Sequence, residues 1–233
     1  MAKKVQTDQA TEVLENVESS LNRAEEFIES NRNPLLIGLG VVVAIALAFY
    51  GYKNYISDPL ELEAQQEIFM AQKYFEQDSL NRALNGVPGQ NMGFLDIADE
   101  FGSTKAGNLA NYYAGVCYLQ LGQFAEAIEY LDQFSSNDEV LSVVAKGAIG
   151  DAFLELNQPE EALEYYMAAT KINSNDFAVP IYLNKAAKTA EILGDYKSAL
   201  TLYNRIKSDF PKSPEAGEAD KNIAYAETKL SYQ

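Results

Sequence analysis

The longest apolar run in the chain extends from Pro34 to Tyr52 and contains no charged residue. As a helix that rises about 1.5 Å per residue, a run of this length spans roughly 28 Å, close to the thickness of the hydrocarbon core of a bilayer. A helix in the core of a soluble protein usually keeps a polar face, and this run has none. The pattern therefore favours a single transmembrane helix over residues 34–52 rather than a buried core helix.

The residues before and within this run argue against a cleavable signal peptide. A signal peptide opens with a short basic region, whereas residues 1–33 hold 4 basic and 7 acidic side chains. The triplet Ala46-Leu47-Ala48 is similar to a cleavage site, but it lies inside the apolar run and is followed by Phe49. The sequence thus predicts an uncleaved anchor.

The head, residues 1–33, carries apolar side chains three and four positions apart, on one face of a helix that is otherwise rich in glutamate. This seam consists of Leu14, Val17, Leu21, Ala24 and Ile28. Helices that lie on a membrane surface carry Lys and Arg on the polar face, and two heptads are too few for a stable coiled coil alone. The head is therefore predicted to be a solvated helix or a docking seam for a partner helix or a second copy.

The basic residues beside the span indicate its orientation. Arg23 and Arg32 precede it closely, and only Lys53 follows within the next twenty residues. By the positive-inside rule, this bias places the head in the cytoplasm and the rest of the chain outside. Small residues recur every fourth position of the span, which allows another helix to approach closely. This candidate packing face consists of Gly40, Ala44 and Ala48.

Beyond Asp58 the pattern is helical throughout, and it repeats. A motif that begins at Gly115 recurs at Gly150 and at Ala187, at offsets of 35 and 37 residues. Each copy has a small residue in a first helix, a turn residue, and an alanine in a second helix. The turn residues are Gly122, Asn157 and Gly194, and the alanines are Ala127, Ala162 and Ala199. This period and pattern resemble the tetratricopeptide repeat, although the chain has no Trp at the usual early aromatic position.

The recurring residues of the motif each have a steric role. Gly122 and Gly194 allow the backbone conformation that follows a helix end. The three alanines are expected to be buried where the two helices of a hairpin cross. The resulting fold class is all-α: a transmembrane helix and then a solenoid of helical hairpins. Its predicted parts are a linker at 53–59, a degenerate first repeat with an inserted loop at 60–107, three repeats at 108–213 and a capping helix at 214–233.

The composition excludes several functions. The chain carries a formal charge of −16, and the part from Lys53 onward holds 14 basic and 27 acidic residues. Such a surface repels nucleic acid and anionic lipid headgroups. The chain has no His, and its one Cys, Cys117, lies between apolar residues. No phosphate-binding loop or metal motif occurs. The sequence predicts no enzyme, cofactor, metal or small-molecule substrate, with Cys117 as a small buried apolar residue.

A protein-binding surface remains as the expected function. In the repeat that the chain resembles, the first helices line the concave side of the solenoid. The lining expected on this register is Leu109, Tyr112, Val116, Leu119, Gln120, Val144, Asp151, Leu154, Glu155, Ile181, Asn184, Lys188, Glu191 and Ile192. Half of these could instead pack against the adjacent hairpin. An open groove would be apolar with acidic spots and would lack a Lys, Arg and Asn cluster that clamps a carboxylate. It suits an extended ligand that is apolar and neutral or basic.

The order of acidic head, single anchor and repeats resembles that of bacterial inner-membrane proteins of the ancillary SecYEG translocon subunit (YfgM-like) family, with repeats of the Bacteroidetes type. The resemblance runs from Phe27–Asn31 through the span to Tyr52–Tyr55. It implies a periplasmic body that associates with the translocon and handles emerging secretory chains as an accessory subunit or chaperone. A scaffold subunit of another envelope complex, in secretion, cell division or outer-membrane assembly, is the alternative.

Overall fold

The structure, a computed structural model, describes residues 21, 23 and 25–232. The chain forms two compact units, residues 1–59 and residues 60–233. Both units are helical where the structure describes them, and no strand forms there beyond an isolated bridge between Val87 and Asn91. The all-α fold class expected from the sequence is confirmed.

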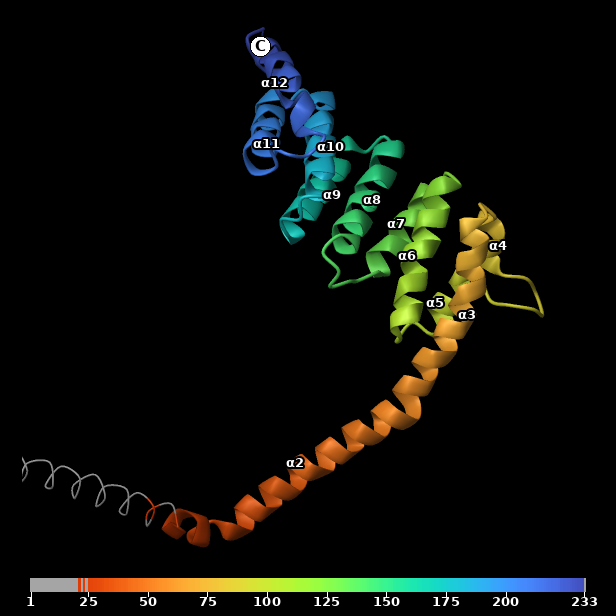
Figure 1. Ribbon diagram of the computed structural model, residues 1–233, viewed down its shortest axis with the longest axis vertical. Helices are drawn as coiled ribbons and strands as arrows, with labels where there is room; N and C mark the ends of the chain where they lie inside the picture. Colours follow the sequence, from red (N-terminus) through yellow and green to blue (C-terminus); the bar gives the residue numbers. More distant parts are fainter. Residues whose placement is uncertain (1–20, 22, 24, 233) are drawn as a thin grey trace, which may run out of the picture. The chain divides into compact units, whose positions relative to one another are not determined.

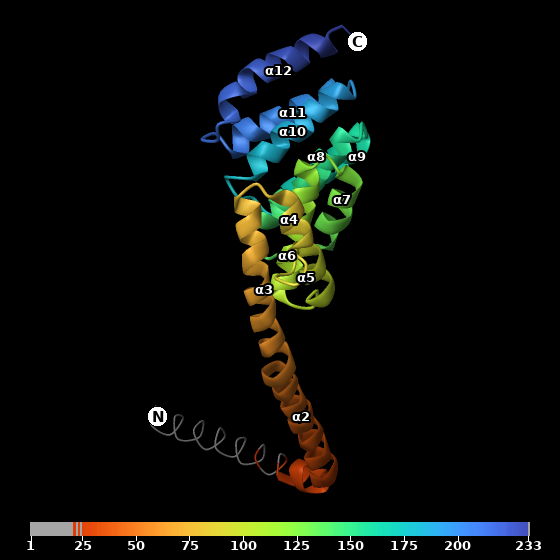
Figure 2. The same ribbon diagram turned by 90° about the vertical axis from the view of Figure 1, so that its right-hand side faces the viewer.

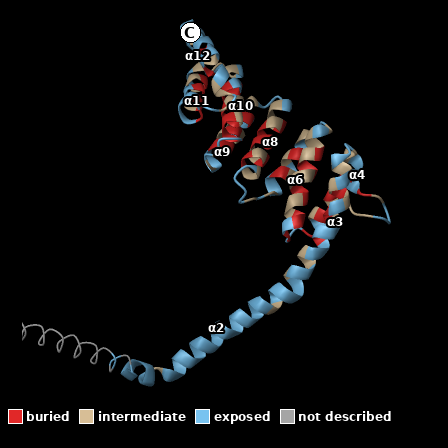
Figure 3. Cartoon of the chain, viewed as in Figure 1, coloured by how far each residue is buried: buried red, intermediate tan, exposed pale blue. Residues whose placement is uncertain are grey.

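The first unit contains the apolar run as helix α2 (Arg32–Tyr52), and none of its residues is buried (Figure 3). It is the one helix in the described part of the chain that is long and apolar enough to cross a membrane, judged by length and composition. Gly40, Ala44 and Ala48 are exposed on it, so their role as a packing face stays a prediction. The expected linker is helical instead, as the π-helix η1 (Lys53–Ser57) and the start of the next helix.

Part of the predicted head seam lies outside the described residues, namely Leu14, Val17 and Ala24. Leu21 and Ile28 are described as helical, and both are more than half exposed. An exposed apolar side chain fits a docking seam and also a solvated helix, so both interpretations of the head remain predictions.

The second unit begins inside α3 (Asp58–Glu76), which is followed by α4 (Leu80–Asn85) and α5 (Phe94–Glu100). Helix α3 continues directly from η1, and the Asp58 amide donates to the Lys53 carbonyl. Buried residues of α3, such as Ile68, share a core with Phe94 and Phe101. The glycine-rich loop between α4 and α5 needs its glycines, since a methyl group on Gly93 would come within 2.1 Å of the Leu84 carbonyl oxygen.

Three helical hairpins follow, and they lie side by side in sequence order (Figures 1 and 2). The first pairs α6 (Lys105–Gln120) with α7 (Phe124–Gln133), and the second pairs α8 (Leu141–Glu155) with α9 (Pro159–Ile172). The third pairs α10 (Val179–Ile192) with α11 (Tyr196–Asp209), and α12 (Ala216–Leu230) packs against α11. These helices account for the three copies of the sequence motif and for the expected final helix.

The turn inside each hairpin has the same geometry. Gly122, Asn157 and Gly194 adopt positive φ values of 74°, 58° and 75°, the left-handed conformation that commonly ends a helix. The amide of the residue after each turn donates to a carbonyl five positions earlier. These bonds are Gln123 to Tyr118 (2.9 Å), Gln158 to Phe153 (2.9 Å) and Asp195 to Ala190 (2.8 Å). The role predicted for Gly122 and Gly194 is confirmed.

Small residues bring the two helices of each hairpin together. A methyl group on Gly115 would come within 2.5 Å of Leu131, and one on Gly150 within 2.7 Å of the Tyr166 ring. The three repeat alanines have no exposed surface, which confirms their predicted burial. They are Ala127, Ala162 and Ala199. Buried residues accordingly concentrate between the helices of the hairpins (Figure 3).

Candidate functional site

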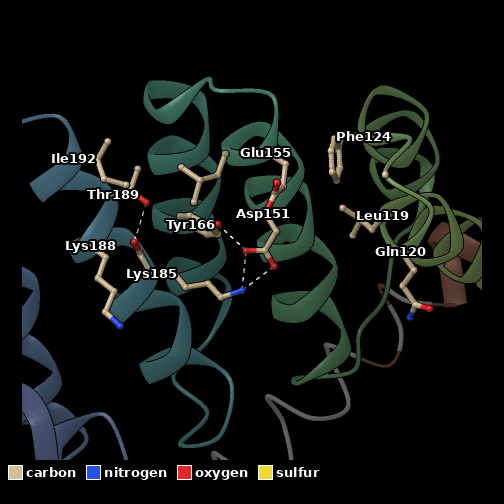
Figure 4. A pocket seen from close by; sticks show the side chains of 12 residues that line it. Leu119, Gln120, Phe124, Asp151, Glu155, Tyr166, Lys185, Lys188, Thr189 and Ile192 are labelled. Carbon is tan, nitrogen blue, oxygen red and sulfur yellow. Dashed lines mark hydrogen bonds and ion pairs between the residues drawn. The ribbon is translucent and has the colours of Figure 1, made fainter.

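A groove of about 700 Å³ crosses the three hairpins on their first helices (Figure 4). The first hairpin contributes the end of α6 and the start of α7, the second contributes α8 with one residue of α9, and the third contributes α10. The groove is lined by Leu119, Gln120, Gly122, Phe124, Asp151, Leu154, Glu155, Tyr166, Lys185, Lys188, Thr189 and Ile192. Its position fits the sequence pattern, since equivalent faces of stacked first helices form one continuous surface.

Asp151 in α8 lies at the centre of a polar cluster in the groove (Figure 4). The Lys185 ammonium in α10 donates to both carboxylate oxygens of Asp151, each at 2.7 Å. The Tyr166 hydroxyl in α9 donates to the same carboxylate at 2.6 Å. A charge-assisted bond of this kind is stronger than a neutral one. The cluster therefore joins three helices from two hairpins. Asp151 and Lys185, which we call the floor of the groove, together carry no net charge.

Two tyrosine rings lie close to the lysine of this cluster. The Lys185 nitrogen lies 5.2 Å from the centroid of the Tyr182 ring and 5.9 Å from that of Tyr166. Burial, and then the bond to Asp151, raise the pKa of Tyr166 well above its usual value, and burial likewise raises the pKa of Tyr182. The Tyr166 hydroxyl consequently keeps its proton at neutral pH and remains a donor to Asp151.

Two charged side chains of the lining take no part in this cluster. Glu155 and Lys188 are exposed, and the structure gives neither an ion pair within its described residues. Thr189 is buried and donates to the Lys185 carbonyl at 2.9 Å. The remaining walls are mainly apolar, and Ile192 alone is 64% exposed. The arrangement is a predominantly apolar trough with a neutralised floor and one free charge of each sign.

Half of the residues expected in the groove line it in the structure. These are Leu119, Gln120, Asp151, Leu154, Glu155, Lys188 and Ile192. Others pack within the hairpins: the Tyr112 ring contacts Phe134 at 5.2 Å, and Tyr112 and Val116 adjoin the buried cluster around Leu131. The further expected residues outside the lining are Leu109, Val144, Ile181, Asn184 and Glu191. The assignment of the groove as a binding site stays a prediction.

The sequence interpretation missed five lining residues: Gly122, Phe124, Tyr166, Lys185 and Thr189. A signal for Lys185 exists in the spacing, because it lies 34 residues after Asp151, about one repeat. Residues one repeat apart face each other across stacked hairpins. Opposite charges at that spacing predict a pair across the junction. Phe124 and Tyr166 belong to second helices, which the expected register did not include.

The described part of the chain holds no cluster of side chains suited to a metal ion. No group of three or more His, Cys, Asp and Glu side chains is placed there to hold a metal ion. Cys117 is completely buried, and burial raises the pKa of its thiol to about 12. A protonated thiol is a poor nucleophile, so Cys117 serves as a packing residue.

The tetratricopeptide repeat family matches residues 109–138, 145–176 and 185–213, one match for each hairpin. The helical body is a tetratricopeptide-repeat solenoid. Its repeats are of the kind that forms scaffolds for protein–protein interaction. None of the curated proteins matches the chain in sequence.

Solved structures share the fold of the solenoid at low sequence identity. One is YrrB, a tetratricopeptide repeat protein with an unusual peptide-binding site, with 19% identity and a TM-score of 0.51 over 71% of this chain and 76% of that chain. Another is MamA, with 16% identity and a TM-score of 0.50 over 72% of this chain and 87% of that chain. At these identities the likeness concerns the fold alone.

Proposed function

We propose that the groove binds an extended segment of a partner protein and that the chain works as a membrane-anchored interaction subunit. The observation that carries this proposal is the groove itself, which crosses three hairpins with mainly apolar walls and a neutralised floor. An apolar trough with a few placed polar groups is typical of ligand sites. YrrB is a protein of the same fold with a peptide-binding site, which supports this use of the solenoid.

The anchor gives the proposal its cellular setting. Helix α2 has the length and composition of a span, and the Arg23, Arg32 and Lys53 bias favours a cytoplasmic head. We therefore place the solenoid at the periplasmic face of a bacterial inner membrane. With the resemblance to ancillary translocon subunits, this favours an accessory subunit or chaperone that meets secretory chains as they emerge. Tethering the groove beside that source raises the effective concentration of its ligand.

Photo-crosslinkers in the groove test the proposal directly. Probes at Leu119, Leu154 and Ile192 should capture secretory chains in transit when the full chain is expressed in the membrane. Matched probes at Glu129 and Glu164, exposed on second helices, should capture few. Equal capture from both faces would contradict a groove-specific function. Crosslinks only from the head or span to a fixed partner would favour a scaffold of another envelope complex.

The orientation has a separate test. Protease added to spheroplasts should degrade residues 53–233 and leave a small anchored fragment with the head. A solenoid that is protected until the membrane is opened would place it in the cytoplasm and overturn the periplasmic assignment.

A further inference from the structure

The acidic group at the centre of the groove is already occupied by the protein's own side chains. Asp151 accepts two bonds from Lys185 and one from Tyr166, at 2.6–2.7 Å (Figure 4). The side chains of the ion pair are only 35–39% exposed, so water reaches them in part. The carboxylate and the ammonium in the middle of the groove thus satisfy each other, and neither is free to hold a charge on a ligand.

The pair makes a buried ligand charge unfavourable. A carboxylate or ammonium that enters the groove loses water and meets a lysine or an aspartate that is already neutralised. At the centre of the groove it could gain a partner only by breaking the Asp151–Lys185 pair and leaving the other member uncompensated, since the free charges of the lining, Glu155 and Lys188, lie at exposed positions. An uncharged apolar side chain meets no such cost, because it displaces water from Leu119, Leu154 and similar walls.

We propose that the Asp151–Lys185 pair sets the specificity of the groove. The ligand it admits is an uncharged apolar stretch inside a polypeptide, with its chain ends and charged residues outside the trough. This inference rests on the proposed function, since it names the class of segment that the groove binds. The sequence alone allowed a neutral or basic ligand. The pair restricts this expectation to a ligand that is neutral where it lies against Asp151 and Lys185.

Opening the pair should switch the preference in a direction set by the residue left behind. In Asp151→Asn the Lys185 ammonium loses its counter-charge and becomes available for a carboxylate on the ligand. In Lys185→Met the Asp151 carboxylate keeps only the Tyr166 hydroxyl and becomes available for a basic residue. The double variant removes both charges and should restore the preference for neutral segments.

The experiment uses the full chain in nanodiscs and three fluorescent peptides with capped ends. The peptides share one moderately apolar sequence and carry Ala, Asp or Lys at the central position. Empty nanodiscs give the background from partitioning into lipid. The parent protein should bind the Ala peptide about tenfold more tightly than either charged peptide, as close charge pairs and their desolvation are worth at least that factor. Asp151→Asn should favour the Asp peptide and Lys185→Met the Lys peptide, each by about tenfold over the parent.

Matched controls separate opening of the pair from a simple change of charge. Lys171→Met and Glu164→Gln remove the same charges from exposed positions of α9 outside the lining, and they should leave the ranking of the peptides as in the parent. Circular dichroism of each variant checks folding. As a measurement without mutation, the affinity of the parent for the Ala peptide should stay constant as salt is raised, because no free charge is engaged.

The outcomes distinguish the inference from the function on which it rests. If all folded variants bound the Ala peptide and ranked the three peptides in the same order, the inference would be overturned and the binding function would stand. The same holds if the affinity of the parent for the Ala peptide fell as salt was raised. No binding above empty nanodiscs in any form would overturn the proposed function as well.

Discussion

The junction between the first and second hairpins differs from the junction between the second and third, although both arise from the same repeat. At the first junction, a small cluster of buried side chains around Leu131 and Ile149 fills the space. Its ion pair, Lys146 with Asp132 at 3.3 Å, lies at the surface, with side chains 36% and 59% exposed. Helix α7, with 10 residues, is also shorter than α9 and α11, with 14 each, so it offers less surface for packing.

At the second junction, large side chains interlock. The Tyr182 ring of α10 occupies the space above Gly147 of α8, where a methyl group would come within 2.0 Å of the ring. The same ring stacks on Tyr166 at 6.1 Å, and its hydroxyl donates to the Val144 carbonyl at 3.3 Å. These residues belong to the most extensive buried cluster of the solenoid, which continues to Phe210.

The comparison shows how a repeat protein can differ in stiffness along its length. Each hairpin contacts mainly its neighbours, so the stability of the solenoid is close to a sum of hairpin and junction terms. Regions with few buried contacts open first. We expect the first junction to open before the second. The groove crosses both, so its Leu119 and Phe124 wall should adapt to a ligand while the Asp151 side remains fixed.

The largest expected effect comes from Tyr182→Ala at the second junction. Removal of a buried aromatic ring leaves a cavity and should cost about 3–5 kcal/mol of unfolding free energy. Hydrogen exchange on the full chain in nanodiscs should show protection lost over α10, α11 and α12, with α6 and α7 unchanged. Tyr182→Phe keeps the ring and loses only the hydroxyl bond, so it should cost about 1 kcal/mol. A uniform loss of protection along the solenoid would contradict the expected difference between the two junctions.

Overpacking the crossings inside the hairpins should have the next largest effect. Leu at Ala127, Ala162 or Ala199, all completely buried, should cost about 1–3 kcal/mol each. Thermal melting of the full chain should show the loss, and hydrogen exchange should confine it to the altered hairpin and its neighbour. In that case Ala127→Leu spares α11, and Ala199→Leu spares α6. If all three variants melted like the parent, the repeat register would be wrong.

Gly147→Ala tests the packing at the second junction by adding a methyl group against the Tyr182 ring, whereas Tyr182→Ala removes that ring. The methyl group must displace the Tyr182 ring, which should cost about 1–2 kcal/mol, near the low end for overpacking. Gly217→Ala in α12 is a matched control, because a methyl group there meets nothing within 4 Å. It should stabilise the chain by about 0.5 kcal/mol through the better helix propensity of alanine. A melting temperature unaffected by Gly147→Ala would show that Tyr182 does not fill that space in solution.

Much of the fold could be predicted from the sequence, because every repeat meets the same local steric requirements. The turn glycines and crossing alanines recur at one period, and each has a local steric reason that applies in every copy. The groove was less predictable. Whether Leu119 faces open space or Tyr112 packs inward depends on the shape of the next hairpin, which no single repeat contains. The Asp151–Lys185 pair depends on the stacking of two repeats, so its signal is only a spacing between opposite charges.

The smallest effect should come from Asp132→Asn at the first junction. This change breaks an ion pair between exposed side chains, and such pairs contribute about 0.5 kcal/mol or less. Asp151→Asn makes the same chemical change at the second junction, where the carboxylate accepts three bonds from two hairpins, and it should cost about 1–2 kcal/mol. Melting of both variants in low and high salt checks the difference, since salt should screen the pair of the more exposed Asp132 more strongly than that of Asp151. Equal losses at the two sites would mean that the ion pairs do not distinguish the junctions, and that the difference in stiffness lies in the buried rings alone.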